Sequence, residues 1–157
     1  MSVIARALGV LLATFLFTGL MGGLPTEHTG ARAEAASTRT THDQRVRAMK
    51  VAMAQRGDPY VYGASGPGAF DCSGLTKFSY GRVGRSIPRT TDQQKSGLRA
   101  VSKRDKSRGD IIVFVHNGDA YHAGIYIGHN RIVHASRSGT PVKVDRIWTS
   151  SYVVRRP

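Results

Sequence analysis

The sequence contains one cysteine, Cys72, in the stretch FDCSGLTKFSY at residues 70–80. This stretch marks the change from a glycine-rich segment to a helical pattern, so Cys72 is expected at a helix N-terminus. The unpaired N–H groups and the dipole of a helix N-terminus stabilise a thiolate, and we therefore expect a lowered pKa for this thiol. Asp71 is a suitable N-cap, and we expect its side chain to turn into the helix start because its charge would otherwise oppose the thiolate. Cys72 is thus a candidate nucleophile, and the alternative is a buried structural thiol.

A thiol nucleophile needs a general base, and that base needs a group that orients it. Two histidines, His122 and His134, fall in segments with strand-like patterns, where packing would fix their positions. A single histidine in a strand is more often structural. Two of them on adjacent strands, together with a thiol at a helix start, favour a base and its partner.

A metal site is the competing interpretation of the histidines, because four of them lie between His116 and His134. None of them shows the HExxH spacing of zinc proteases, and no carboxylates cluster with them. We therefore expect neither a metal nor another cofactor.

The first 36 residues show the features of a secretory signal peptide. An early arginine precedes an apolar run at residues 7–24, and the small residues at 31–36 offer A-x-A-type cleavage sites. Threonines and glycines interrupt the run, which is short for a membrane span of about 20 strongly apolar residues. The predicted organisation is a signal peptide at 1–36, a short polar linker at 37–42 and one folded domain at 43–157.

The composition is strongly basic. Lys and Arg number 23 against 10 Asp and Glu, which gives a formal net charge of +13 at pH 7. Such a surface concentrates polyanions, and outside the membrane the expected ones are cell-wall polymers and acidic peptides. Nucleic acid is not an expected partner, because the basic residues are scattered and no recognised nucleic-acid motif accompanies them. A general solubilising role is the alternative explanation of this charge.

The order of the predicted elements indicates an α+β domain. Apolar residues recur at helical spacing over residues 43–56 and 73–80, and a short capped helix is predicted within residues 87–97. Helices followed by a meander of strands predict an antiparallel sheet with the N-terminal helices packed on one of its faces. The strand-like runs, separated by turn sequences, are DIIVFV, YHAGIYIG, RIVHAS, PVKVDRI and SYVVRR.

Five segments, in this order and spacing, resemble the NlpC/P60 family of bacterial cell-wall cysteine peptidases, which have a papain-like α+β fold. They are PYVYGASGPGAFDCSGLTKFSY, IPRTTDQQ, RGDIIVF, HAGIYIG and IVHAS. The combination of DCSGL, H-x-GIY-x-G and HA is far more specific than any one segment. The resemblance implies that Cys72 is the nucleophile, His122 the general base and His134 the residue that orients the base.

The resemblance also implies an activity, a location and a substrate. The implied protein is a peptidoglycan hydrolase, secreted or cell-wall associated, that cleaves an amide of the stem peptide, specifically the bond from γ-D-glutamate to the diamino acid. Tyr60 and Ser73 would contact the oxyanion or the substrate. The family's usual Gly-Gly is Gly63-Ala64 here, and its usual valine after the base is Ala123, which leaves the specificity open.

Two other functions remain as alternatives, a non-catalytic cationic wall-binding module and an acyltransferase of the same superfamily. The intact set of one cysteine and two histidines favours hydrolysis, because a pure binding module has no need of it. The implied partners are peptidoglycan stem peptides and anionic wall polymers. We expect a monomer that does not bind the membrane after signal cleavage.

These roles require His122 and His134 on one face of the sheet. Side chains alternate along a strand, so the turn between the two strands decides the matter. A two-residue turn would place the histidines on opposite faces, whereas a three-residue loop that pairs Ile127 with Arg131 would place them on one face. We predict the three-residue loop, with Asn130 in the left-handed conformation and the imidazoles of both histidines on the face that meets Cys72.

Overall fold

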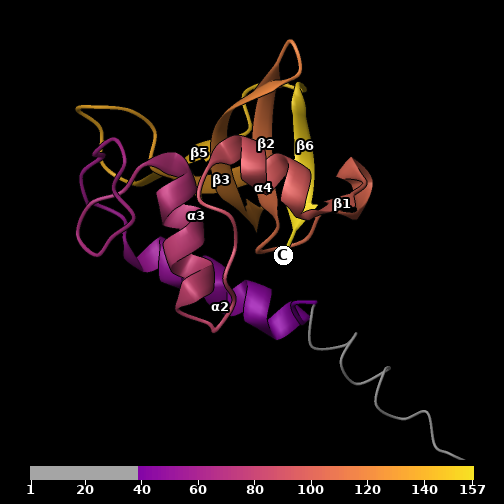
Figure 1. Ribbon diagram of the computed structural model, residues 1–157, viewed down its shortest axis with the longest axis horizontal. Coiled ribbons are helices and arrows are strands. Elements are labelled where there is room, and N and C mark those ends of the chain that lie inside the picture. Colours follow the sequence, from indigo (N-terminus) through magenta and orange to yellow (C-terminus); the bar gives the residue numbers. More distant parts are fainter. Residues whose placement is uncertain (1–38) are drawn as a thin grey trace, which may run out of the picture.

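The computed structural model describes residues 39–157. The predicted signal peptide and the first residues of the predicted linker lie outside this range. Within residues 39–157, no helix is long and apolar enough to cross a membrane. The described residues form one antiparallel sheet with three α-helices packed against it (Figure 1). This is the predicted α+β arrangement.

Each of the three α-helices begins after a polar N-cap residue. Thr41 and Thr90 form capping boxes, in which the side-chain oxygen of the glutamine three residues later accepts a hydrogen bond from the N–H of the cap residue. Asp71 caps the middle helix through the N–H of Gly74. The first two helices lie within two residues of the predicted bounds and the third lies within the predicted segment, at α2 His42–Ala54, α3 Cys72–Gly81 and α4 Thr91–Gly97.

The sheet has six strands in the order β1-β6-β2-β3-β4-β5, and neighbouring strands are antiparallel. The five strand-like runs of the sequence form β2 to β6. The first strand was not predicted, because its three residues show no alternation and it is defined by pairing with the distant C-terminal strand. The strands are β1 Arg99–Val101, β2 Ile111–His116, β3 Asp119–Gly128, β4 Arg131–His134, β5 Lys143–Arg146 and β6 Tyr152–Arg156, with a 3-10 helix at Lys103–Asp105.

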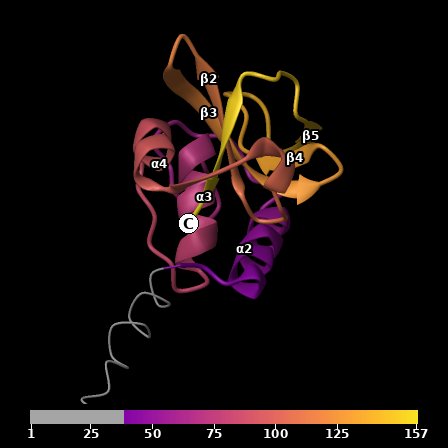
Figure 2. The same ribbon diagram turned by 90° about the vertical axis from the view of Figure 1, so that its right-hand side faces the viewer.

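The helices cover one face of the sheet, with α3 and α4 packed on β3 and α2 packed on α3 (Figures 1 and 2). Alternate strand residues such as Val113 and Ile125 face the helices and share the main core with Leu75 of α3. The opposite face has a smaller core that includes Phe114 and Ile147. The sheet is therefore buried on both faces near its middle, where the two histidines lie.

A buried ion pair joins the first helix to the end of the sheet. Asp110 is fully buried, and its carboxylate accepts two hydrogen bonds of 2.7 Å from Arg156, while Arg45 of α2 lies 3.6 Å away. Nearby, the N–H of Thr40 donates to the Pro157 carbonyl at 3.2 Å. Packed structure therefore begins at Thr40, within the segment predicted as a linker.

The hairpin between β3 and β4 differs from the prediction. Its turn has two residues, His129 and Asn130, with φ of 50° and 56°, and a bulge at Ile127 lies just before the turn. The predicted three-residue loop is wrong, because two left-handed residues match the twist of the strands. The left-handed Asn130 is confirmed. The bulge restores the register that the longer loop would have given, so the two histidines still share a face.

The face that the histidines share is the face of Phe114 and Ile132, whereas Leu75 of α3 packs on the opposite face. The predicted placement of the imidazoles on the face that meets α3 is therefore wrong. Cys72, at the tip of α3, is instead close to the backbone of β3 at Ala123.

Candidate active site

Cys72 is the first residue of α3, and a tight loop packs against the start of this helix. The Asp71 carboxylate accepts a 2.6 Å hydrogen bond from the N–H of Gly74, and the Ala64 carbonyl accepts the N–H of Asp71 at 2.9 Å. A Cβ atom on Gly74 would lie 2.1 Å from the Ala64 carbonyl oxygen. Only glycine at this position lets the loop approach the helix so closely.

Asp71 points into the helix start, as predicted, and forms an ion pair with Arg89. The guanidinium bonds both carboxylate oxygens of Asp71, with 3.0 Å to Oδ1, and also donates to the Ser73 hydroxyl at 3.0 Å. Burial alone would raise the pKa of Asp71, but the hydrogen bonds from Arg89 and Gly74 outweigh burial and lower it. The carboxylate beside the thiol is thus ionised and partly neutralised by an arginine that the sequence reasoning did not identify.

The thiol of Cys72 is partly buried beside β3. The N–H groups of Ala123 and Ser73 and the Thr91 hydroxyl lie near its sulfur, and all three favour the thiolate. Burial outweighs them and, with the charge of Asp71, raises the pKa of the Cys72 thiol. The expected lowering of this pKa is wrong for the unliganded protein, because desolvation exceeds the effect of the helix N-terminus.

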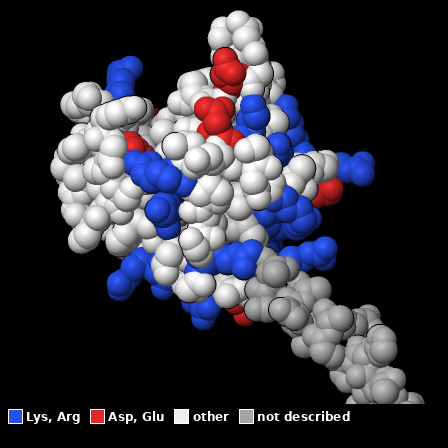
Figure 3. Space-filling view, in the orientation of Figure 1, with Lys and Arg blue, Asp and Glu red and all other residues white. Residues whose placement is uncertain are grey.

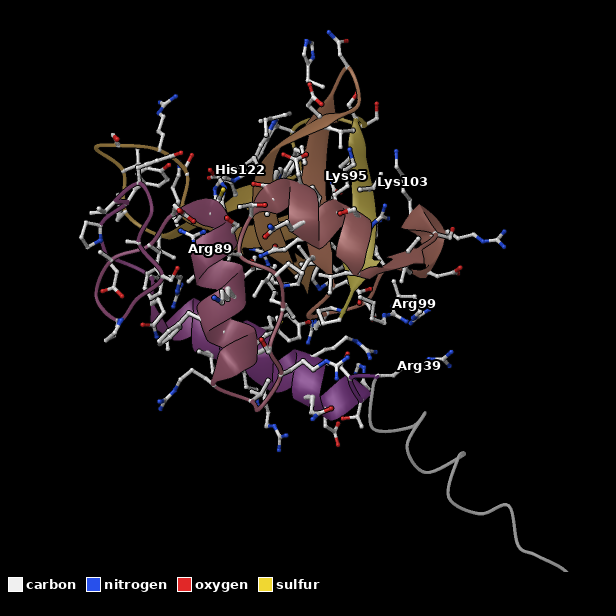
Figure 4. All side chains as sticks on the ribbon, in the orientation of Figure 1. Arg39, Arg89, Lys95, Arg99, Lys103 and His122 are labelled. Carbon is white, nitrogen blue, oxygen red and sulfur yellow. The ribbon has the colours of Figure 1, made fainter. Side chains whose placement is uncertain are left out.

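The predicted histidines lie together on adjacent strands. Nε2 of His122 is 2.7 Å from Nδ1 of His134, and the ring centroids are 5.0 Å apart. The contact with Ala123 places the Cys72 sulfur next to the strand residue that follows His122, and Figure 4 shows His122 near the N-terminal end of α3. Gly124 leaves room for the histidine pair, since a Cβ there would lie 3.1 Å from the Cβ of His134.

The hydrogen-bond chain continues beyond the predicted residues. Nε2 of His134 lies 3.0 Å from Oδ2 of Asp145, and the Lys143 ammonium lies 3.0 Å from the same oxygen. Asp145 and Lys143 both belong to β5, the strand next to β4. Sequence reasoning missed them, because only the pairing of β4 with β5 brings them to the histidine.

Burial keeps both histidines uncharged. Burial, followed by the effect of His134, lowers the pKa of His122 from 6.5 to about 3. Burial also lowers the pKa of His134, although Asp145 acts in the opposite direction. A neutral imidazole can accept a proton, so His122 is in the form that a general base requires at neutral pH.

Trp148 covers the histidine pair and packs against two further aromatic residues, Phe114 and Tyr121. The Trp148 ring stacks on Phe114 with a centroid distance of 3.9 Å and lies 5.6 Å from each histidine ring. Its indole N–H lies 3.4 Å from the Tyr121 hydroxyl. Tyr121 lies at a bulge of β3, immediately before His122, and bulges commonly re-aim side chains beside active sites. Neither Trp148 nor Tyr121 was predicted from the sequence as a site residue.

A cleft of about 450 Å³ opens at the thiol. Both residues predicted at the oxyanion or substrate, Tyr60 and Ser73, line this cleft with Cys72. Burial, together with the charges of Cys72 and Asp71, raises the pKa of the Tyr60 phenol, which therefore stays a hydrogen-bond donor at neutral pH. The structure thus brings three of the predicted site residues, Cys72, Tyr60 and Ser73, to this cleft, and the other two, His122 and His134, to a hydrogen-bonded pair on β3 and β4.

The histidines and carboxylates form no metal site in the part of the chain that the structure describes. Within residues 39–157, no three histidine, cysteine or carboxylate side chains are arranged to hold a metal ion. Instead, His122, His134 and Asp145 use their polar atoms to bind one another.

Comparison with known proteins adds a family to this geometry. The sequence model of the NlpC/P60 family matches residues 57–156. A probable endopeptidase of Corynebacterium glutamicum (strain R) is 45% identical over 112 residues, which cover 71% of this chain and 51% of that protein. The bifunctional muramidase/DL-endopeptidase CwlT of Bacillus subtilis (strain 168) is 37% identical over 58% of this chain and 29% of its own length. The chain thus spans about half of the first relative and less of the second.

Solved structures show the same fold. The NlpC/p60 domain of the peptidoglycan hydrolase SagA has a TM-score of 0.65 and 31% identity, and the match covers 72% of this chain and 97% of that one. NlpC1 from Trichomonas vaginalis has a TM-score of 0.66 and 32% identity, over 74% of this chain and 45% of its own.

Proposed function

Because the chain belongs to the NlpC/P60 family, we propose that it is a cysteine endopeptidase that hydrolyses an amide bond in the stem peptide of peptidoglycan. The observation that carries this proposal is the position of the single thiol, at the start of α3 and against the backbone of β3 beside His122. A relative with a muramidase/DL-endopeptidase name and a solved peptidoglycan hydrolase domain support the substrate class.

The resting site holds a neutral thiol and a neutral imidazole. The pKa of Cys72 is raised and that of His122 is lowered, so a thiolate–imidazolium pair is disfavoured before substrate binds. Nε2 of His122 is occupied by His134, which leaves Nδ1 to accept the thiol proton. We therefore propose that proton transfer accompanies the attack of sulfur on the substrate carbonyl.

The chemical steps follow from this starting state. His122 takes the proton of Cys72 as sulfur bonds to the carbonyl carbon, and the resulting oxyanion accepts hydrogen bonds from N–H groups at the start of α3 and from the Tyr60 hydroxyl. His122 then gives the proton to the departing amine, and the C–N bond breaks to leave a thioester. Water attacks the thioester with His122 as base, which releases the carboxylic acid and restores the thiol.

The bond that we propose is the one between γ-D-glutamate and the diamino acid. The test is digestion of purified muropeptides, with the product masses assigned by mass spectrometry. The matched control is the same protein alkylated at Cys72, its one cysteine. Cleavage at another stem amide would change the assigned bond, transfer of the acyl group to an added amine in place of water would favour an acyltransferase, and no cleavage would favour a binding module.

We also propose that the protein is secreted and associated with the cell wall, and the basic surface supports this location. Figure 3 shows Lys and Arg side chains spread over the lower and right-hand parts of the displayed face, around α2 and β1, with few acidic residues among them. The net charge of +13 would hold the enzyme on anionic wall polymers by long-range attraction. Added salt would then weaken binding to whole cell walls more than it slows cleavage of small muropeptides.

A further inference from the structure

Three neighbouring strands carry one continuous hydrogen-bond chain behind the thiol. It runs from His122 on β3 to His134 on β4 over 2.7 Å, and from His134 to Asp145 on β5 over 3.0 Å. In the register of the sheet, His134 pairs with Lys143, and Ile132 pairs with Asp145. Asp145 is therefore the diagonal neighbour of His134 on the same face of the sheet, and its carboxylate can reach Nε2 of His134.

The carboxylate determines where the hydrogens of this chain lie. The hydrogen bonds from Lys143 and His134 lower the pKa of Asp145 despite the opposing effect of burial, so Asp145 is ionised and can only accept hydrogen bonds. Nε2 of His134 must then carry a hydrogen, and its Nδ1 is left as an acceptor. The 2.7 Å contact requires one hydrogen, which Nε2 of His122 supplies. Nδ1 of His122 is consequently unprotonated.

Without the carboxylate, the hydrogens of this hydrogen-bond chain can be arranged in a second way. His134 can carry its hydrogen on Nδ1 and donate it to Nε2 of His122. The hydrogen of His122 then lies on Nδ1, the nitrogen that must accept the thiol proton. In this tautomer His122 cannot act as the base. We propose that Asp145 is a positioning residue, which selects the active tautomer of His122 through His134. This inference rests on the proposed function, since it assigns His122 as the base.

Lys143 holds the carboxylate in place. Its ammonium lies 3.0 Å from Oδ2 of Asp145, the oxygen that also accepts from His134. Both side chains are partly exposed, with 43% of Lys143 and 37% of Asp145 accessible, whereas 1% of the His134 side chain is. Asp145 thus links a buried imidazole to the surface, where substitution is tolerated without opening the core.

The test compares Asp145→Ala with Asp145→Asn, whose amide oxygen can still accept from His134. Asp105→Asn is the control, because it removes one acidic charge at an exposed site on the 3-10 helix. We expect Asp145→Ala to lower kcat for muropeptides by about tenfold or more with KM little changed, Asp145→Asn to recover part of the loss, and Asp105→Asn to match the wild type.

Nitrogen-15 NMR of the histidine rings gives a readout that does not depend on activity. The wild type should show His134 with its hydrogen on Nε2, and Asp145→Ala should show a substantial population with the hydrogen on Nδ1. His134 protonated on Nδ1 in the wild type, or a tautomer and kcat unchanged in Asp145→Ala, would overturn the proposal. If the wild type cleaves no muropeptide, the proposed function fails, while the NMR comparison still decides whether Asp145 sets the tautomer.

Discussion

The thiol and the histidine pair are positioned in different ways. Cys72 lies on a helix start that is set locally, by the Asp71 cap, the close packing on Gly74 and the ion pair with Arg89, and it faces an open cleft. The histidines lie on separate strands under aromatic rings, and their contact depends on strand register. The nucleophile is therefore encoded in one short motif, whereas the base is assembled by the whole sheet.

The difference is also electrostatic. Next to the thiol, the charged side chain of Asp71 is hydrogen-bonded by Arg89, which offsets its charge. Around His122, the nearest rings are uncharged, and burial dominates its pKa. Burial acts in opposite directions on the two groups, raising the pKa of a thiol and lowering that of an imidazole. The consequence is a neutral pair that becomes charged only during reaction.

The largest expected effect is a difference in activity between substitutions of the two histidines. His122→Gln removes the base and should reduce kcat for muropeptides by about a hundredfold or more. His134→Gln should retain partial activity, because its amide can still bond Nε2 of His122. His42→Gln, at the exposed start of α2, is the control. Equal losses in the two site variants would mean that the assigned roles are wrong.

The packing at the nucleophile gives the next effect. Gly74→Ala would place a Cβ 2.1 Å from the Ala64 carbonyl oxygen. We expect the free energy of unfolding to fall by about 1–3 kcal/mol, because overpacking outweighs the helix preference for alanine. Gly81→Ala, in the same helix with no atom within 4 Å of its added Cβ, is the matched control and should not destabilise. Urea unfolding measures both, and equal stabilities would show that the loop is not held as described.

Acid unfolding tests the buried histidine. The pKa of His122 is about 3 in the folded protein and 6.5 when unperturbed, so between these values the unfolded chain binds more protons. Stability should therefore fall as pH is lowered below about 6.5, a range that begins above the titration of most carboxylates. The slope of unfolding free energy against pH should be smaller in His122→Gln. An identical slope in both proteins would place His122 in contact with solvent.

Alkylation reports the smallest effect, on the thiol. Because burial raises the pKa of Cys72, its rate of reaction with iodoacetamide should rise with pH to a midpoint above that of free cysteine. Thr91→Val should shift the midpoint further upward, since the Thr91 hydroxyl favours the thiolate. A midpoint below that of free cysteine would indicate a thiolate already formed at rest and would overturn the neutral-pair mechanism.

Local sequence predicted most of the nucleophile region. The aspartate cap, the helix starting at Cys72 and the glycine-rich loop before it are all contiguous, so composition and spacing suffice to place them. The raised pKa of the thiol was not predictable in the same way. It depends on how far the sheet buries the sulfur, and the contact with Ala123 joins residues from separate elements.

The histidine region was predicted only in part. Alternation along the strand-like runs placed His122 and His134 in the sheet. Because side chains alternate along each strand, the length of the turn between the two strands decides whether the histidines share a face. The bulge at Ile127 was missed, because a two-residue turn combined with a one-residue bulge gives the same strand register as a three-residue loop. Asp145 and Trp148 were missed because they reach the histidines across strands and through a loop.

The most direct test of the catalytic account uses the thiol alone. Wild-type protein and Cys72→Ala are incubated with the same muropeptides, and the products are quantified by mass spectrometry after both proteins are shown to have the same thermal midpoint. The account predicts stem-peptide cleavage by the wild type and none by Cys72→Ala, since the side chain is small and removal of its sulfur leaves the core in place. Cleavage by the alanine variant at the wild-type rate would contradict the assignment of Cys72 as the nucleophile.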